Sequence, residues 1–276
     1  MSANGQGPGT SVALSTSSCY PQSTAWAFAQ AARLGYDGVE VMVWREPASQ
    51  DVDTLRDLVQ QHGVPVLSVH APTLLLTQRV WGSDPWAKVD RSAALAEALG
   101  AEVVVMHPPF RWQRDYARGF VTGVAERQER TAVKLTVENM FPWKARSRES
   151  PRARDRHAYL PHWDPVPLDY AHVTLDLSHA GIAGMDALAA ARALGPRLAH
   201  VHLTDSSGSN RDEHLVPGAG AQPCGELLEL LPGIGFTGSV AVEVTTRKMS
   251  EDARDEALAA SLAFARAHLA GGAGQA

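Results

Sequence analysis

Short apolar runs alternate with longer stretches of helical periodicity along most of the chain. The runs are rich in Val and Leu and are nearly continuous rather than alternating, which is typical of strands that are buried on both faces. We therefore predict eight strands, at residues 12–15, 38–43, 65–70, 102–107, 132–138, 172–176, 198–203 and 239–244.

Helical patterns fill the spaces between these strands. Several of them stop at a glycine, as helices commonly do. Strands that alternate with helices predict an α/β protein with a single (β/α)8 TIM barrel, a fold of typically about 250 residues. A doubly wound open sheet is the alternative, but no G-x-G-x-x-G motif follows the first strand. The predicted helices are 23–34, 51–62, 84–99, 113–130, 185–194, 223–231 and 251–269.

The predicted barrel domain covers residues 12–270, between a disordered leader (1–11) and a disordered tail (271–276). One connection, 140–171, is unusually long and contains several prolines. Its segment 144–156 is basic. Connections of this length are lids, binding loops or flexible insertions, and the sequence leaves these alternatives open.

Composition excludes several classes of protein. The 276 residues include 25 Lys and Arg against 30 Asp and Glu, a net charge of −5, which argues against broad nonspecific binding of nucleic acid. No apolar run reaches the about 18 residues of a membrane span, and the first basic residue is Arg33, which is unlike a secretory signal. Two cysteines exclude a disulfide scaffold, so we expect a cytoplasmic protein.

Candidate metal ligands follow the third to the eighth predicted strand. Active sites of TIM barrels lie at the carboxyl ends of the strands, so we expect these side chains to meet at one rim. A network of His–carboxylate hydrogen bonds without metal is the alternative. Imidazole mixed with carboxylate suits Zn²⁺ or Mn²⁺ better than Mg²⁺ or Ca²⁺. The residues are His70, His107, Glu138, Asp176, His179, His202, Asp212, His214 and Glu243.

A set of motifs in a fixed order carries a family resemblance. With them the chain resembles the xylose-isomerase-like TIM-barrel superfamily, which joins sugar isomerases and epimerases with abasic-site nucleases of the endonuclease IV type. The motifs are GYDGVEV (35–41), SVHAP (68–72), VVMHPP (104–109), TVEN (136–139), TLDLSHA (174–180), HVHLTD (200–205), DEHLVPGAG (212–220) and VAVEV (240–244).

The resemblance implies two ligand sets. In the isomerase and epimerase branch one divalent ion is held by Glu138, Asp176, His202 and Glu243. The two glutamates there also act as acid and base on opposite faces of the substrate, and a histidine at the position of His179 contacts it. The nuclease branch has three zinc ions, so one to three ions are expected per chain. Its additional ligands fall on His70, His107, His179, Asp212 and His214.

Two features favour the isomerase branch. GYDGVEV is common among its members, and the DNA-penetrating Tyr of the nucleases is replaced here by Thr73. We therefore expect an isomerase or epimerase that transfers a proton at a carbon next to a metal-polarised carbonyl of a sugar, sugar phosphate or related compound. A zinc phosphoesterase, with DNA or a small phosphoester as substrate, and a metal-binding barrel without turnover are the alternatives. A homo-oligomer is compatible with the sequence.

Further substrate contacts are predicted near the rim, in addition to His179. Trp44 and Trp112 belong to six tryptophans in predicted strand-to-helix loops, where they either stack on a ligand or merely cover the barrel's open end. Arg111 and Lys144 either hold a phosphate or carboxylate or lie on the surface. Ser-His-Asp catalysis is not expected, because no G-x-S-x-G elbow is present. The other four tryptophans are Trp81, Trp86, Trp143 and Trp163.

Overall fold

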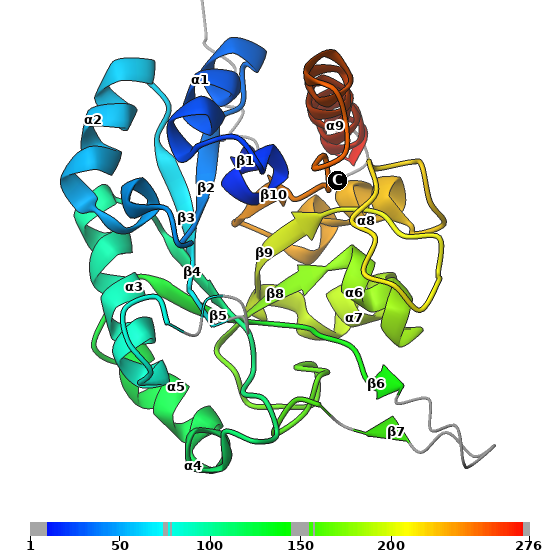
Figure 1. Ribbon diagram of the computed structural model, residues 1–276. Helices are drawn as coiled ribbons and strands as arrows, with labels where there is room; N and C mark the ends of the chain where they lie inside the picture. The colour runs from blue at the N-terminus through cyan, green and yellow to red at the C-terminus, as the bar shows by residue number, and fades with distance from the viewer. Residues whose placement is uncertain (1–9, 74–76, 78, 145–154, 157, 273–276) are drawn as a thin grey trace, which may run out of the picture.

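The computed structural model describes residues 10–73, 77, 79–144, 155–156 and 158–272. Eight parallel strands close into a barrel in the order β1-β10-β9-β8-β5-β4-β3-β2 (Figure 1), which confirms the predicted single TIM barrel. The barrel strands are β1 (Ser11–Ser15), β2 (Gly38–Met42), β3 (Val66–His70), β4 (Val103–Met106), β5 (Lys134–Glu138), β8 (His172–Asp176), β9 (Leu198–Leu203) and β10 (Ser239–Val242).

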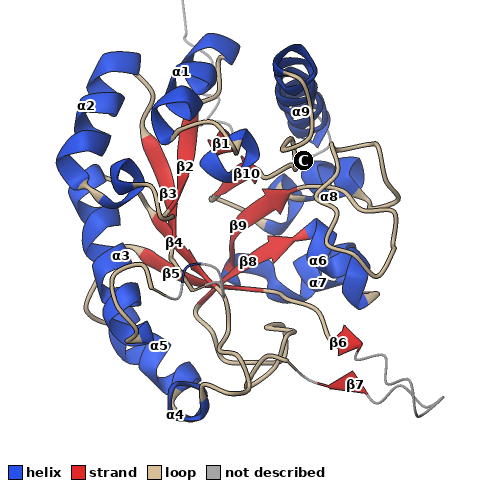
Figure 2. Cartoon of the chain, in the orientation of Figure 1, coloured by secondary structure: helices blue, strands red, loops and turns tan. Residues whose placement is uncertain are grey.

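Helices surround the strands (Figure 2). Asp51, Asp84 and Asp186 cap three of them, because each carboxylate accepts a hydrogen bond from an amide of the first turn. Within the described residues, no helix is both long and apolar enough to cross a membrane. The helices are α1 (Thr24–Leu34), α2 (Val52–His62), α3 (Pro85–Leu99), α4 (Arg114–Arg118), α5 (Phe120–Gln128), α6 (Leu177–Ala183), α7 (Ala187–Leu194), α8 (Cys224–Leu230) and α9 (Glu251–Gly272), with short 3-10 turns that include η1 (Thr16–Cys19).

The predicted set of helices differs from the structure in two places. The predicted helix 113–130 is divided at Gly119 into α4 and α5. Helix α6 was not predicted; it begins directly after β8, where the Asp176 carboxylate accepts from the backbone N–H of His179 at 2.7 Å. Gly184 ends α6 in the left-handed conformation at φ 68°, where a side chain would be strained. The D-x-x-H motif is thus a helix N-cap as well as a pair of candidate ligands.

The predicted ends of the domain also differ slightly from the structure. Ser11 already belongs to β1, and α9 extends through Gly272. Residues 1–9 of the predicted leader and 273–276 of the predicted tail lie outside the described residues.

The long connection 140–171 is anchored in its described parts. Its β6 (Trp143–Lys144) and β7 (Asp155–Arg156) form a two-stranded antiparallel ribbon, visible beside the barrel in Figure 1. Tyr159 forms a β-bridge with Phe110 of the loop after β4, and the two side chains are buried together with Met140. The connection therefore packs against the rim of the barrel. Most of the basic segment 144–156 lies outside the described residues.

Apolar and polar residues divide between the two faces of the barrel strands. On β2, Val39 and Val41 belong to the hydrophobic core that the helices cover, whereas Glu40 between them is fully buried and hydrogen-bonds to Ser68 of β3. Side chains alternate between faces along a strand, so Glu40 points into the barrel. The barrel interior is therefore partly polar, although the strand sequences are largely apolar.

Candidate metal centre

Glu138, at the end of β5, lies at the middle of the site. Its carboxylate is 1% exposed and is surrounded by four imidazoles. Oε2 is 3.3 Å from His70 Nε2 and 2.9 Å from His107 Nε2, and Oε1 is 3.0 Å from His179 Nδ1 and 3.3 Å from His202 Nδ1. Histidines from four other strands or the loops that follow them thus converge on the carboxylate at the end of β5.

Three overlapping groups at this rim have ligand atoms close enough to hold a metal ion. Within each group these atoms lie within 4.8 Å of one another, and Glu138 belongs to two of the groups. The groups are His70–His107–Glu138, Glu138–Asp176–His202 and Asp176–His179–His214.

Asp212 and Glu243 complete the predicted set. Glu243 Oε2 is 3.0 Å from His202 Nδ1 in the second group. The Asp212 carboxylate lies beside both histidines of the third group, 3.4 Å from His179 Nε2 and 2.9 Å from His214 Nε2. All nine residues that the sequence analysis named as candidate ligands therefore lie around one rim.

Three of the histidines are oriented by the backbone. His70, His179 and His214 place Nδ1 at 3.2, 3.0 and 2.8 Å, respectively, from a backbone carbonyl oxygen. A carbonyl only accepts, so Nδ1 donates its proton to it, and Nε2 is the nitrogen that would offer a lone pair to a metal once its own proton is lost. Metal-binding histidines are typically held in this way by a second partner. The three carbonyls belong to Ala71, Asn139 and Glu243.

His202 is oriented the opposite way, by a residue that the sequence analysis did not identify as functional. Its Nδ1 faces the carboxylates of the centre, while its Nε2 is 3.3 Å from Glu40. Glu40 also accepts from His200 Nε2 at 2.9 Å and from Ser68 at 2.8 Å. The available signal was a glutamate in the middle of an apolar strand together with the H-x-H alternation of β9, which turns both histidines inward.

Hydrogen bonds also hold the remaining parts of the centre. Asn139 ties β5 to β8, because its amide accepts from the Asp176 N–H at 2.7 Å and donates to the Asp176 carbonyl at 3.0 Å. Ser17 of η1 donates to Glu243 at 3.0 Å. The loop after β9 is fixed by the buried Asp205 carboxylate, which accepts from the amides of Ser206, Gly218, Gly220 and Gln222.

The charges at the centre stabilise one another. Burial alone would raise the pKa of Glu138, but His107 and His202 hold it well below its usual range. In the same way, His202 lowers the pKa of Glu243 to about 2 against the effect of burial. Burial would lower the pKa of His214, yet Asp212 raises it to about 10. Protonated imidazoles thus balance ionised carboxylates, and a divalent cation can supply the same positive charge.

The donor set fits a divalent metal. Asp176 Oδ2 is buried without a hydrogen-bond partner, and so is His107 Nδ1. A buried carboxylate oxygen without a partner costs on the order of 1–3 kcal/mol or more, and a cation between it and the neighbouring ligands would remove that cost. Nitrogen and oxygen donors without cysteine suit Zn²⁺ or Mn²⁺.

The predicted substrate contacts are distributed unevenly. Trp112 lines a cavity of about 340 Å³ beside His107, whereas Arg111 is exposed and is not among the residues that line it. Trp44 is half-buried just after β2, and its backbone N–H donates to Ser49. Lys144 forms part of the β6 backbone, and its side chain lies outside the described part of the structure.

Two other tryptophans of the predicted loop set pack into the protein, and one of them lies in a helix rather than in a loop. Trp86 belongs to the first turn of α3 and packs against Tyr116 and Phe120, with ring centroids 4.7 and 5.9 Å apart. Trp81 packs against the hydrophobic core. Neither is available as an open stacking surface.

The sequence also matches a family model, described as xylose isomerase-like TIM barrel, over residues 28–268. The chain belongs to the xylose isomerase-like TIM-barrel family. An uncharacterized protein of Mycobacterium tuberculosis (strain H37Rv) is 51% identical over 276 residues, covering 95% of this chain and 99% of that protein. The fructoselysine 3-epimerase of Escherichia coli O157:H7 is 22% identical, covering 82% and 86%, respectively.

Solved structures share the same fold. A D-tagatose 3-epimerase-like protein superimposes with a TM-score of 0.64 at 20% identity, covering 93% of this chain and 98% of that one. The IolI protein, solved with a zinc atom bound, gives a TM-score of 0.66 at 17% identity, with 94% and 98% coverage. At these identities the likeness concerns the fold.

Proposed function

We propose that this protein is a divalent-metal-dependent isomerase or epimerase acting on a sugar or a related polyhydroxy carbonyl compound. The observation that carries the proposal is the position of His202 Nδ1, which lies 3.0 Å from Glu243, 3.3 Å from Glu138 and 3.6 Å from Asp176. One ion at this point would have the four ligands that an epimerase of this family needs. The similarity to a fructoselysine 3-epimerase agrees with this proposal.

The two glutamates are the proposed acid and base. Glu138 ends β5 and Glu243 follows β10, and these strands are not neighbours in the barrel. A substrate carbon between the two glutamates would meet one carboxylate on each face. The bound metal would polarise the carbonyl of the substrate. Glu243 is held by Ser17 and is 12% exposed, which leaves it accessible to a ligand while its carboxylate stays ionised. His179, next to Asp176, would contact a substrate hydroxyl.

Hydrogen exchange tests this proposal without knowledge of the product. The metal-loaded protein, incubated in D₂O with a panel of ketoses, aldoses and their phosphates, should incorporate deuterium at a carbon next to a carbonyl. Glu243→Gln should abolish the incorporation, and Glu226→Gln, on the exposed surface of α8, should leave it unchanged. Deuterium incorporation that persists in Glu243→Gln would contradict the assignment.

A zinc phosphoesterase is the second candidate, because a specific observation favours it. His179 and His214 form a third group with Asp176, and the Asp212 carboxylate lies beside both histidines, an arrangement that isomerisation does not require. Several metal ions can stabilise the attacking and leaving oxygens of a phosphoester. Incubation of the zinc-loaded protein with abasic duplex DNA and with small phosphoesters tests it. Cleavage without deuterium incorporation would replace the first proposal with the second; binding of sugars without either reaction would favour a non-catalytic role.

A further inference from the structure

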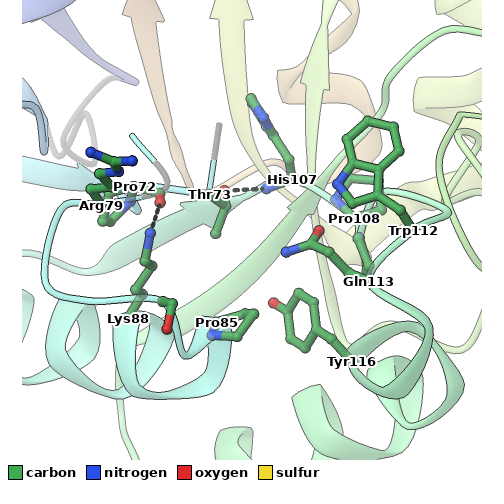
Figure 3. Close-up of a pocket in the computed structure, with 12 residues that line it drawn as sticks. Pro72, Thr73, Arg79, Pro85, Lys88, His107, Pro108, Trp112, Gln113 and Tyr116 are labelled. Atoms are coloured by element: carbon green, nitrogen blue, oxygen red, sulfur yellow. Dashed lines mark hydrogen bonds between the residues drawn. The ribbon is translucent and has the colours of Figure 1, made fainter. Parts of the chain in front are cut away.

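A cavity of about 340 Å³ opens beside the metal centre, between the loops that follow β3 and β4 (Figure 3). His107 connects the two, because it lines the cavity while its Nε2 lies 2.9 Å from Glu138. Thr73, which follows the β3 histidine, accepts a hydrogen bond from the His107 backbone N–H at 3.2 Å. A ligand that fills this cavity would therefore lie against a residue of the centre itself.

The charged side chains that line the cavity are all of the basic type. Arg79 and Lys88 lie on one wall, and no Asp or Glu is among the described lining residues. Lys88 is 4% exposed, and its ammonium donates to the carbonyls of Pro72 at 3.2 Å and Thr77 at 2.9 Å. Arg79 is exposed and remains accessible to a ligand.

The opposite wall carries neutral donors. Tyr116 is only 7% exposed, and its buried hydroxyl has no hydrogen-bond partner within the described residues. Gln113 uses its Oε1 to accept from the Phe110 N–H at 2.9 Å, so its amide NH₂ is the group left to offer. Figure 3 shows the polar ends of both side chains turned toward the wall that carries Lys88. Such a buried hydroxyl indicates a missing partner.

We propose that this cavity, which we term the anion pocket, binds a negatively charged group at the far end of the substrate, a phosphate ester or a carboxylate. The inference rests on the proposed function, since it places the carbonyl end of the same molecule at the metal centre. Cations and donors without acidic residues match an anion. Trp112 stacks on Phe110 with centroids 4.7 Å apart and supplies an apolar surface for the carbon chain.

Isothermal titration of the metal-loaded protein compares anionic probes with their neutral parents. The pairs are fructose 6-phosphate with fructose, which reports a phosphate ester, and glucuronate with glucose, which reports a carboxylate. At least one anionic member should bind about ten-fold or more tightly than its parent, the effect of one or two charge-assisted hydrogen bonds. The pair that shows the larger difference identifies the chemical source of the charge.

Arg79→Gln is the decisive variant, and Arg118→Gln is its matched control. Both arginines are exposed, but only Arg79 lines the cavity, whereas Arg118 lies at the end of α4. Arg79→Gln should weaken binding of the anionic probe about ten-fold while the neutral parent is unaffected, and Arg118→Gln should change neither. Tyr116→Phe, which keeps the packing, should weaken the anionic probe by a smaller factor. Metal content and circular dichroism verify that each variant is folded.

The possible results separate this inference from the proposed function. Phosphate also coordinates divalent metals, so the dependence on Arg79, rather than binding itself, decides the outcome. Anionic probes that bind no better than their parents, or equally well to Arg79→Gln, overturn the anion pocket. Failure of the proposed function appears differently, as Arg79-dependent binding without deuterium incorporation from any member of the panel.

Discussion

The two sides of the metal centre are built in different ways. Glu138, Asp176 and His202 belong to barrel strands and are at most 1% exposed. Asp212 and His214 belong to the loop after β9; the Asp212 side chain is 39% exposed, and His214 has a left-handed backbone at φ 45°. Strand residues are placed by the register of a closed barrel, whereas the loop residues depend on a few hydrogen bonds.

Those few bonds can be identified. Ser178 donates to Asp212 at 3.0 Å and accepts from the His214 N–H at 3.3 Å, and Asp205 pairs with Leu215 through two backbone bonds of 2.8 and 2.9 Å. A non-glycine residue in the left-handed region is typical of functional sites. Under the proposed function, the strand side would supply the proton transfer, and the loop side would add a metal position that can be removed separately.

The largest effect is expected from Glu138→Gln on the strand side. The change removes the carboxylate that four imidazoles share, so it should abolish deuterium incorporation and strongly reduce the metal bound per chain. Elemental analysis and the exchange assay measure the two effects. Glu226→Gln again serves as the control, and a variant that keeps both its metal and its activity would contradict the central position of Glu138.

Glu40→Gln should have the next largest effect, because it disturbs the strand side through His202. Loss of the carboxylate that orients a metal-binding histidine typically reduces metal affinity or activity about 10–100-fold. Ser239→Ala removes only a distant partner, the hydroxyl 3.0 Å from His200 Nδ1, and should cost much less. Restoration of the lost activity at high zinc concentration would identify a positioning role, whereas equal losses in both variants would contradict it.

The pH dependence of zinc binding tests the electrostatics of the loop side. Because the pKa of His214 is raised to about 10 in the metal-free protein, the side chain is protonated at pH 7, and the metal must displace that proton. Zinc affinity should therefore rise as the pH increases from 6 to 9, by about ten-fold per pH unit for each proton displaced.

Calorimetry in buffers with different ionisation enthalpies counts the protons released on zinc binding. His214→Gln should release fewer protons than the wild type, and His62→Gln, at the end of α2 away from the centre, should release the same number. A zinc affinity independent of pH over this range would contradict the protonated state of His214.

The smallest effect on isomerisation is expected from Asp212→Asn. The variant should lose about one metal ion per chain, since it weakens the third group, while deuterium incorporation changes only a few-fold. Glu213→Gln is a closely matched control, because Glu213 accepts from Ser207 and lies outside the centre. A complete loss of exchange in Asp212→Asn would show that the loop side is part of the catalytic machinery.

Much of the fold and of the site could be predicted from local sequence. Continuous Val and Leu runs give nearly correct strand bounds, because a strand of a parallel barrel is covered by helices on one side and by other strands' side chains on the other. A His or acidic residue at the end of such a run, as at His70 and Glu138, places a ligand at the rim. Trp86 was placed among the loop tryptophans although the predicted helix 84–99 already contains it, and in the structure α3 begins at Pro85.

The role of Glu40 could not be predicted from the sequence around it. A carboxylate within GVEVM is costly to bury unless it is paired, and its partners His200 and His202 are 160 and 162 residues away. No local pattern connects them. The same is true of the anion pocket, in which Arg79, Gln113 and Tyr116 meet only because the loops after β3 and β4 lie side by side.

Continuous apolar runs between helical stretches, together with the positions of histidines and acids, determined the barrel, its strands and the rim on which the nine ligand candidates lie. These features depend only on burial of each strand on both faces and on the common direction of parallel strands. Tertiary structure alone decided which nitrogen of each imidazole faces the carboxylates and that Glu40 orients His202 from inside the barrel. Those features require atoms from distant strands at distances near 3 Å, and only the closed barrel establishes such distances.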